Sequence, residues 1–312
     1  HNYLERRCNI CYDPDHEIMV TVGGSEAIDA AMRAMIDPGD EVLIPQPSYV
    51  SYTPCCVLAD GVPVPIELEE KDRFRLTPEK LLEKITPKTK ILVLPFPNNP
   101  TGAIMEREDL EKIAEIILEK DLFVISDEIY SELTYAKEDH VSIASLPGMK
   151  ERTVLINGFS KAFAMTGWRM GYLAADAKLI LPMLKVHQYA VASSNIIAQN
   201  AAITALQAGE ACVEEMRQEY ARRRRFLLDS FAEIPEISCA EPAGTFYMYP
   251  NISGSGLSGT EFADRFLMEA GVATVPGTAF DSFCNSHIRI SYASSMESLQ
   301  TAVSRLKGML KK

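Results

Sequence analysis

The sequence lacks a long apolar run and a surplus of positive charge. Its longest apolar stretches are short or interrupted by Pro, Lys or Asp, so no membrane-spanning helix is expected. No secretory signal precedes the first predicted element. The formal net charge of −12 at pH 7 argues against nucleic acid or an anionic membrane surface as a general partner. A pocket that is locally positive could still hold an anionic ligand.

A regular cysteine pattern is also absent. The chain has seven cysteines, an odd number, and they follow no disulfide-framework spacing. Cys8 and Cys11 form a CxxC pair, but no second pair of cysteines or histidines completes a metal site. Cys55 and Cys56 are adjacent and are expected to be packed, and no histidine has ligand spacing. The sequence therefore predicts no bound metal and a reducing compartment, the cytoplasm.

Short apolar strands alternate with amphipathic helices in the first two-thirds of the 312 residues. Several strands are β-branched runs with almost no polar alternation, which is typical of strands buried on both faces of a mostly parallel sheet. The pattern predicts an α/β fold with ligands at the carboxyl ends of the strands. Strands are expected at 18–22, 41–44, 62–66, 90–94, 122–126, 153–157 and 171–174, and helices at 25–36 and 106–119.

The composition changes after about residue 176. An Ala-rich helix is predicted at 179–208, followed by a strongly charged helix at 210–231 that contains Arg222–Arg225. This arginine run could be a nucleic-acid patch, but the interleaved acidic residues favour the solvated face of a long helix that links two domains. The later segments predict a smaller α+β domain, with strands at 245–249 and 288–292 and helices at 259–269 and 296–310. We expect a large domain over residues 1–222 and a small one over 223–312.

A serine, a lysine and an arginine occur together where the chain leaves the apolar run 153–156. Lys161 lies beside small, apolar and aromatic residues, and desolvation can remove its proton and make it a nucleophile toward a carbonyl. Ser160 and Arg169 could hold a phosphate through hydrogen bonds and charge. Together these residues suggest a Schiff base to a phosphorylated aldehyde. Taken alone, the lysine could equally be a surface residue.

Two further motifs follow predicted strands. Gly23, Gly24, Ser25 and Glu26 stand between a strand and a helix, so their backbone N–H groups and the helix dipole can hold a phosphate. An ordinary strand-to-helix turn is at least as common. Asn99 follows the strand that ends at Leu94, in a Pro-rich connection that could fix its amide at the edge of the sheet. A turn bridged by asparagine is an equal alternative.

Two charged side chains complete the set of candidates. Asp127 ends the apolar strand at 122–125, where a buried acid is costly unless it meets a cation or a protonated nitrogen. Tyr130 would point to the same place if the chain turns helical, although Asp127 could also be an N-cap. Arg289 lies in an alternating strand pattern, where its guanidinium would suit a carboxylate. Without context, an exposed strand arginine is the simpler interpretation.

The order and spacing of these five motifs resemble those of the pyridoxal-phosphate-dependent aminotransferases of fold type I, the class I/II or aspartate-aminotransferase-like family. The motifs are Gly-Gly-Ser-Glu-Ala, Asn-Asn-Pro-Thr-Gly, Ser-Asp-Glu-Ile-Tyr, Ser-Lys-x5-Gly-x-Arg and Arg-Ile-Ser, and the similarity runs from about residue 18 to the C-terminus. The resemblance implies a mostly parallel sheet sandwiched by helices, followed by a smaller α+β C-terminal domain. It also implies pyridoxal 5′-phosphate (PLP) as the cofactor.

The resemblance assigns roles to individual residues. Lys161 would form the Schiff base with PLP and later move the Cα proton, with Asp127 paired to the pyridine nitrogen. Tyr130 and Asn99 would hydrogen-bond the phenolate oxygen of the ring. Asn99 and Arg289 would bind the substrate, the arginine through the α-carboxylate. The full expected cofactor site consists of Gly24, Ser25, Glu26, Tyr49, Asn99, Asp127, Tyr130, Ser160, Lys161 and Arg169, with Tyr49 stacked on the ring.

The implied reaction moves an amino group from an L-amino acid of the aspartate or aromatic class to a 2-oxo acid such as 2-oxoglutarate. A PLP-dependent C–S β-lyase is the alternative, because such enzymes share the lysine and the carboxylate-binding arginine. A ligand-sensing domain of a transcription regulator is a further alternative. The resemblance also implies a homodimer. Family members carry a further segment before the Gly-Gly motif, so the N-terminal arm is expected to be absent from this chain, which begins 22 residues before Gly23.

Overall fold

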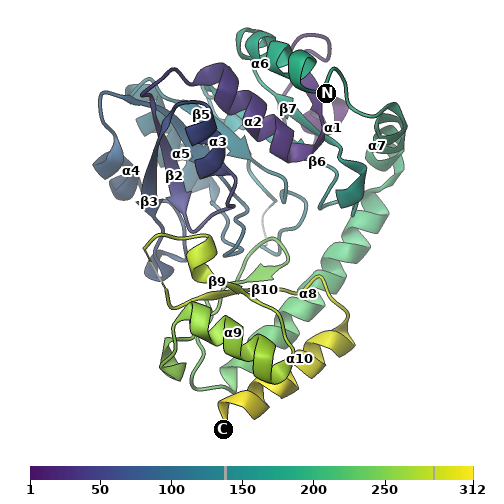
Figure 1. Ribbon diagram of the computed structural model, residues 1–312. Coiled ribbons are helices and arrows are strands. Elements are labelled where there is room, and N and C mark those ends of the chain that lie inside the picture. Colours follow the sequence, from purple (N-terminus) through teal and green to yellow (C-terminus); the bar gives the residue numbers. More distant parts are fainter. Residues whose placement is uncertain (137–138, 284, 312) are drawn as a thin grey trace.

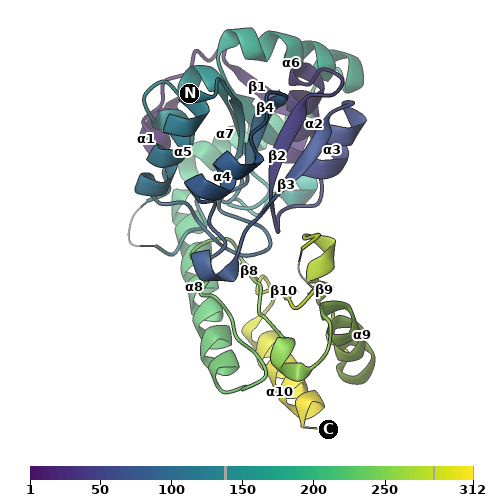
Figure 2. The ribbon, with the colours of Figure 1, turned by 90° about the vertical axis from the view of Figure 1, so that its left-hand side faces the viewer.

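The structure is a computed structural model that describes residues 1–136, 139–283 and 285–311. A large N-terminal body contains the main sheet, and a smaller C-terminal body lies below it in Figure 1. Helix α8 (Glu210–Ala232) runs from beside the large body down along the small one in both views (Figures 1 and 2). The long charged helix predicted at 210–231 is therefore confirmed.

The large body is built on a seven-stranded sheet with the order β1-β7-β6-β5-β4-β2-β3. Strands β2 to β6 pair in parallel, whereas β7 is antiparallel to both β6 and β1. All seven predicted strands are present within one or two residues, and the mostly parallel α/β sheet is confirmed. Their bounds are β1 (Ile18–Thr21), β2 (Glu41–Gln46), β3 (Val62–Glu67), β4 (Thr89–Leu94), β5 (Phe123–Asp127), β6 (Thr153–Gly158) and β7 (Gly171–Ala174).

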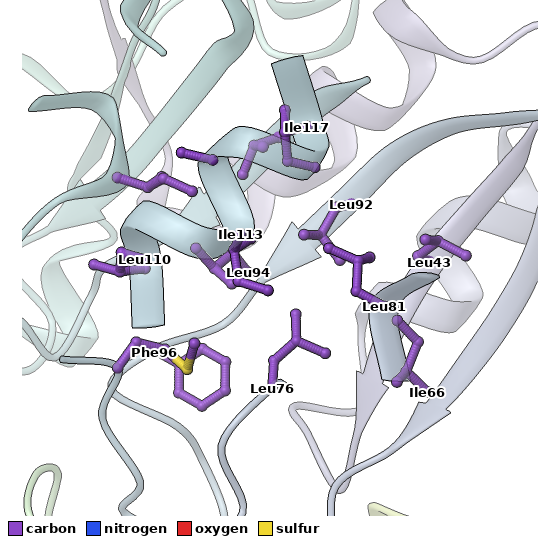
Figure 3. Close-up of a cluster of buried hydrophobic side chains, with 14 of the residues drawn as sticks. Leu43, Ile66, Leu76, Leu81, Leu92, Leu94, Phe96, Leu110, Ile113 and Ile117 are labelled. Carbon is purple, nitrogen blue, oxygen red and sulfur yellow. The ribbon is translucent and has the colours of Figure 1, made fainter. Parts of the chain in front are cut away.

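Helices cover both faces of this sheet. Successive strand residues point to opposite sides and are apolar on both, so each face needs a covering layer. In β4, Leu92 and Leu94 pack with α4 (Pro78–Lys84) and α5 (Arg107–Glu119). Figure 3 shows this cluster, with Ile113 of α5 beside Leu94 and with Leu110 and Ile117 on the same helix. Ile91 and Val93 pack on the other face with α2 (Gly23–Met35), α3 (Tyr52–Leu58) and α6 (Ala177–Ala190).

The Ala-rich segment forms two helices, so the single helix predicted at 179–208 is wrong. Helix α6 ends at Ala190, and α7 begins at Ile196 and ends at Ala208. Asn195 caps α7, since its side-chain oxygen accepts hydrogen bonds from the backbone N–H groups of Ile197 (2.8 Å) and Ala198 (3.2 Å). This local cap competes with a continuous helix. Helix α1 (Asn2–Cys8) packs near α7 in a separate cluster around Leu155.

The small body has its own sheet and core. Strands β8 (Tyr247–Met248), β10 (Ile288–Ser291) and β9 (Val275–Pro276) form an antiparallel sheet in that spatial order. Helices α9 (Gly259–Ala270) and α10 (Met296–Leu310) pack on it with α8 around a separate apolar cluster. This confirms the smaller α+β unit. Short 3-10 helices lie at Glu70–Asp72, Ile143–Ser145, Lys150–Arg152, Thr166–Trp168, Ser253–Ser255 and Gly277–Ala279.

The arginine run lies on α8 and is paired with nearby acids. Arg222 and Arg223 both contact Glu219, and Arg225 contacts Asp229 one turn later. Such pairs neutralise the run locally. The domain boundary predicted between residues 222 and 223 falls inside this helix and stays a prediction. In the described part of the chain, no helix combines the length and apolar character needed to cross a membrane.

Candidate active site

One cavity of about 320 Å³ lies at the carboxyl ends of the central strands and reaches the small sheet. Strand β1 runs in the same direction as β6, because both are antiparallel to β7, so the start of α2 is delivered to this same edge. Of the predicted site residues, all except Glu26 line this cavity: Gly24, Ser25, Tyr49, Asn99, Asp127, Tyr130, Ser160, Lys161, Arg169 and Arg289.

Lys161 projects its amine into an aromatic part of the cavity, on the loop that follows β6. Its Nζ lies 5.6 Å from the ring centre of Phe246 and 5.7 Å from that of Tyr130. Burial lowers the pKa of Lys161, and the charges of Arg289 and Arg169 lower it further, while Asp127 opposes this shift. The environment therefore favours the neutral, nucleophilic amine.

Asp127 is a buried carboxylate at the last position of β5. It accepts hydrogen bonds from the hydroxyl of Tyr52 (2.7 Å) and the backbone N–H of Ile129 (3.2 Å). Burial raises the pKa of Asp127 and outweighs these two bonds, which act in the opposite direction. An uncompensated buried carboxylate is costly, so this position suits a cationic partner such as a protonated ring nitrogen.

Tyr130 reaches the cavity from a turn and not from a helix. The segment after Asp127 folds into turns in which the N–H of Ser131 donates to the carbonyl of Glu128. The Tyr130 hydroxyl lies 3.5 Å from that of Tyr247, and its ring meets Phe246 edge-on at 5.5 Å. Burial raises the pKa of Tyr130 well above its usual range, so the hydroxyl is neutral and can donate a hydrogen bond.

The start of α2 and Arg169 form an anion cradle. The first N–H groups of a helix have no partner within the helix and carry partial positive charge. The Arg169 guanidinium lies beside them and donates to the carbonyls of Thr166 (3.0 Å) and Val22 (3.4 Å). Gly23 has φ +79°, and a Cβ there would come within 2.6 Å of Arg169 Nη2. Glycine is therefore required for the guanidinium to approach this turn.

Arg289 forms the other charged part of the cavity, on β10. Its Nη1 donates to the side-chain oxygen of Asn99 at 3.0 Å, and its guanidinium lies over the rings of Tyr247 (4.4 Å) and Phe280 (4.7 Å). Within residues 1–136, 139–283 and 285–311, no carboxylate forms a salt bridge with it. The planar fork is thus held by stacking and by one amide, which leaves charge available for a carboxylate ligand.

The comparisons with known proteins agree with this arrangement. Residues 1–306 match the family described as aminotransferase class I and II. The chain belongs to this family. It is 44% identical to an aspartate aminotransferase of Pyrococcus abyssi, over 99% of this chain and 79% of the relative. It is 42% identical to an aromatic-amino-acid aminotransferase of Thermococcus litoralis, over 96% of this chain and 77% of the relative.

A solved structure supports the same assignment. The crystal structure of an aromatic aminotransferase from Pyrococcus horikoshii superposes with a TM-score of 0.97 and 43% identity, over 99% of this chain and 83% of that one. The fold is therefore that of the fold-type I aminotransferases, and the chain is a transaminase. The relatives do not favour the C–S β-lyase alternative.

Glu26 of this aminotransferase does not line the cavity, although the sequence placed it among the cofactor ligands. Its carboxylate accepts a hydrogen bond from the backbone N–H of Val22 (2.5 Å) and contacts His187 Nδ1 (2.6 Å). It lies in the first turn of α2, and its side chain is occupied by these two groups. The motif therefore predicts the position of the strand-to-helix turn, but the Glu26 side chain points away from the cavity.

Two tyrosines of the aminotransferase cavity were missed by sequence reasoning. Tyr52 donates to Asp127, and its ring meets that of Tyr49 edge-on at 5.8 Å. Tyr247, on β8, lies between Tyr130 and Arg289. The spacing of Tyr49 and Tyr52 at the start of a helix was the available signal for the first. Tyr247 carried none, because its neighbours Phe246 and Tyr249 are also aromatic.

Proposed function

We propose that this aminotransferase uses PLP to move the amino group of an aspartate-class or aromatic-class L-amino acid to a 2-oxo acid such as 2-oxoglutarate. One observation carries the proposal: an amine with a lowered pKa shares a cavity with a buried carboxylate, between two arginines. The substrate classes are those in the names of the relatives from Pyrococcus abyssi and Thermococcus litoralis.

The residues of the cavity fit the cofactor's functional groups. Arg169, Ser160, Ser25 and the amides at Gly24 would hold the phosphate, because a guanidinium, two hydroxyls and the first turn of a helix line the same part of the cavity. Asp127 would face the ring nitrogen, the cation that its buried position calls for. We place the remaining cofactor contacts on three side chains: Tyr49 against the ring, and Tyr130 and Asn99 at the ring oxygen.

When bound, PLP supplies a conjugated ring that withdraws electrons from the α-carbon of the substrate. Arg289 would bind the α-carboxylate and orient the Cα–H bond toward Lys161. The amine of Lys161 would accept the α-proton at Nζ, because burial lowers its pKa and so favours the unprotonated form that a general base needs. The rings of Tyr130 and Phe246 would keep water from that amine.

A half-reaction tests this proposal. The PLP-loaded enzyme is mixed with one amino acid, without a 2-oxo acid, and the matching 2-oxo acid is quantified by mass spectrometry. We expect a single equivalent per subunit from aspartate or an aromatic amino acid, and continuous turnover once 2-oxoglutarate is added. Absence of product across a broad amino-acid panel would refute the proposal. Release of pyruvate and ammonia from cystathionine would instead support a lyase.

We also propose that the enzyme is a homodimer, as the family resemblance implies, and that it lies in the cytoplasm, as the cysteine pattern predicts. Support for the dimer comes from large apolar side chains that remain exposed at the end of α6 and on α7: Tyr189 (92% exposed), Ile196, Ile197 and Ile203. Large apolar side chains that are exposed in consecutive elements are typical of an interaction surface. Sedimentation equilibrium should give twice the subunit mass, and a monomer at micromolar concentration would count against the dimer.

A further inference from the structure

A buried histidine–glutamate pair joins the start of α2 to the end of α6. Glu26 lies in the first turn of α2, and His187 lies in the last turn of α6. Glu26 Oε1 is 2.6 Å from His187 Nδ1, with the side chains 13% and 7% exposed. A carboxylate can only accept, so Nδ1 carries the hydrogen. The position of Glu26 favours this arrangement, because the first turn of a helix stabilises negative charge.

This pair is connected to the anion cradle through one residue, Val22, which uses its N–H on one side and its carbonyl on the other. The other oxygen of Glu26 accepts from the N–H of Val22 at 2.5 Å, and the carbonyl of Val22 accepts from Arg169 Nη2 at 3.4 Å. Val22 immediately precedes the helix that carries Gly24 and Ser25. The backbone of Val22 is therefore fixed by two hydrogen bonds, one to Glu26 and one from Arg169.

The contact with His187 also fixes the direction of the Glu26 carboxylate. A carboxylate in the first turn of α2 would repel an anion bound at the same helix start if it turned toward the cavity. Both of its oxygens are occupied, one by His187 and one by Val22, and Glu26 is not among the residues that line the cavity. His187 thus holds the carboxylate away from the cradle while Glu26 holds the turn.

We propose that His187 and Glu26 are positioning residues that set the affinity for the phosphate group of the cofactor. They would act by fixing the turn at residues 22–25, and with it Arg169 and the first amides of α2. Neither residue touches the cofactor in this account. The inference rests on the proposed use of PLP, and it predicts an effect confined to the phosphate end of the ligand.

Binding of PLP and of pyridoxal, which lacks the phosphate, separates this role from a general structural one. In His187→Phe the ring volume remains but the hydrogen bond is lost. The dissociation constant for PLP should rise on the order of tenfold, as expected for loss of a hydrogen bond to a charged group, with that for pyridoxal unchanged. His187→Asn, which retains a donor near Nδ1, should restore most of the affinity. The matched control is His16→Phe, at an exposed histidine 3.0 Å from Asp13, and it should change neither constant.

Each outcome bears on the proposal. Glu26→Ala removes the hydrogen bond to the N–H of Val22 directly, and it should raise the dissociation constant for PLP without changing that for pyridoxal. This second variant keeps the proposal testable if His187→Phe fails to fold. The inference is overturned if His187→Phe binds PLP as tightly as the wild type, or if PLP and pyridoxal are weakened equally. If the wild type itself does not prefer PLP over pyridoxal, the proposed function fails instead.

Discussion

Replacing Tyr52 with phenylalanine removes a single hydrogen bond from the buried carboxylate of Asp127. The hydroxyl of Tyr52 donates to Asp127 at 2.7 Å, and both residues are buried. Phenylalanine keeps the ring and its packing, so the change leaves no large void. After the substitution, Asp127 retains only the N–H of Ile129 as a donor among the described residues.

The expected size of the effect depends on the charge of Asp127. A hydrogen bond to a charged group contributes about 1.5–3 kcal/mol, and one between neutral groups about 0.5–1.5 kcal/mol. We therefore expect Tyr52→Phe to lower the free energy of unfolding of the cofactor-free protein by about 2 kcal/mol where Asp127 is ionised. Where Asp127 is protonated, the loss should fall to about 1 kcal/mol.

The pH dependence follows from the raised pKa of Asp127 in the folded state. Between its ordinary pKa in the unfolded chain and its raised folded value, the folded protein binds more protons, so stability decreases as pH rises. Loss of the Tyr52 bond raises the folded pKa of Asp127 further. The difference between variant and wild type should therefore be smallest in acid and grow as pH rises through the folded pKa.

Urea denaturation of the cofactor-free protein at several pH values from 8 downward measures this difference. Tyr49→Phe is the matched control, because Tyr49 lines the same cavity while the two donors to Asp127 are Tyr52 and Ile129. A loss of stability that is independent of pH, or equal in the two variants, would refute the assignment of the bond to an ionised Asp127.

Three further predictions concern other parts of the site. Arg289→Leu should raise KM for the amino acid roughly 100-fold, since a bidentate charged contact is lost; unchanged KM in steady-state assays would argue against its role. Gly23→Ala should lower the free energy of unfolding by about 1–3 kcal/mol and weaken PLP binding, because φ is +79° and the new Cβ meets Arg169. Calorimetry measures the first effect and a binding titration the second. Wild-type affinity would contradict the close approach of Arg169 to Gly23. Glu128→Ala should lower the free energy of unfolding by about 3 kcal/mol, because Glu128 is buried against His140 and two serine hydroxyls. A decrease below about 1 kcal/mol in urea denaturation would show that this network contributes little.

The fold could be predicted from the sequence to the extent that strands are buried on both faces. Runs such as Lys90–Leu94 admit few alternatives, since Leu92 and Ile91 each face a layer of helices. Short elements carried no comparable signal: α3 and α4 each have seven residues and too few turns for a periodic pattern. The break at residues 191–195 was missed because the apolar Ala-rich composition continues across it, and only the capping bonds of Asn195 show where the second helix begins.

Most residues of the candidate site could be predicted from the sequence, whereas the hydrogen bonds that link them to other segments could not. Asp127 ends a parallel strand, and Lys161 and Asn99 follow two others, so topology alone brings them to one edge of the sheet. Contacts between distant segments gave no local pattern, and for this reason the bond from Tyr52 to Asp127 was not predicted. The direction of Glu26 is likewise set by a helix more than 150 residues away in the sequence.

The attachment point of the cofactor tests the central claim most directly. The purified protein is incubated with PLP, reduced with sodium borohydride and digested, and the modified peptide is sequenced by mass spectrometry. The account predicts a phosphopyridoxyl group on Lys161, and its loss in Lys161→Arg, because Lys161 is the cavity lysine whose pKa burial lowers. A label on a different lysine, or a protein that stays unlabelled while folded, would contradict it.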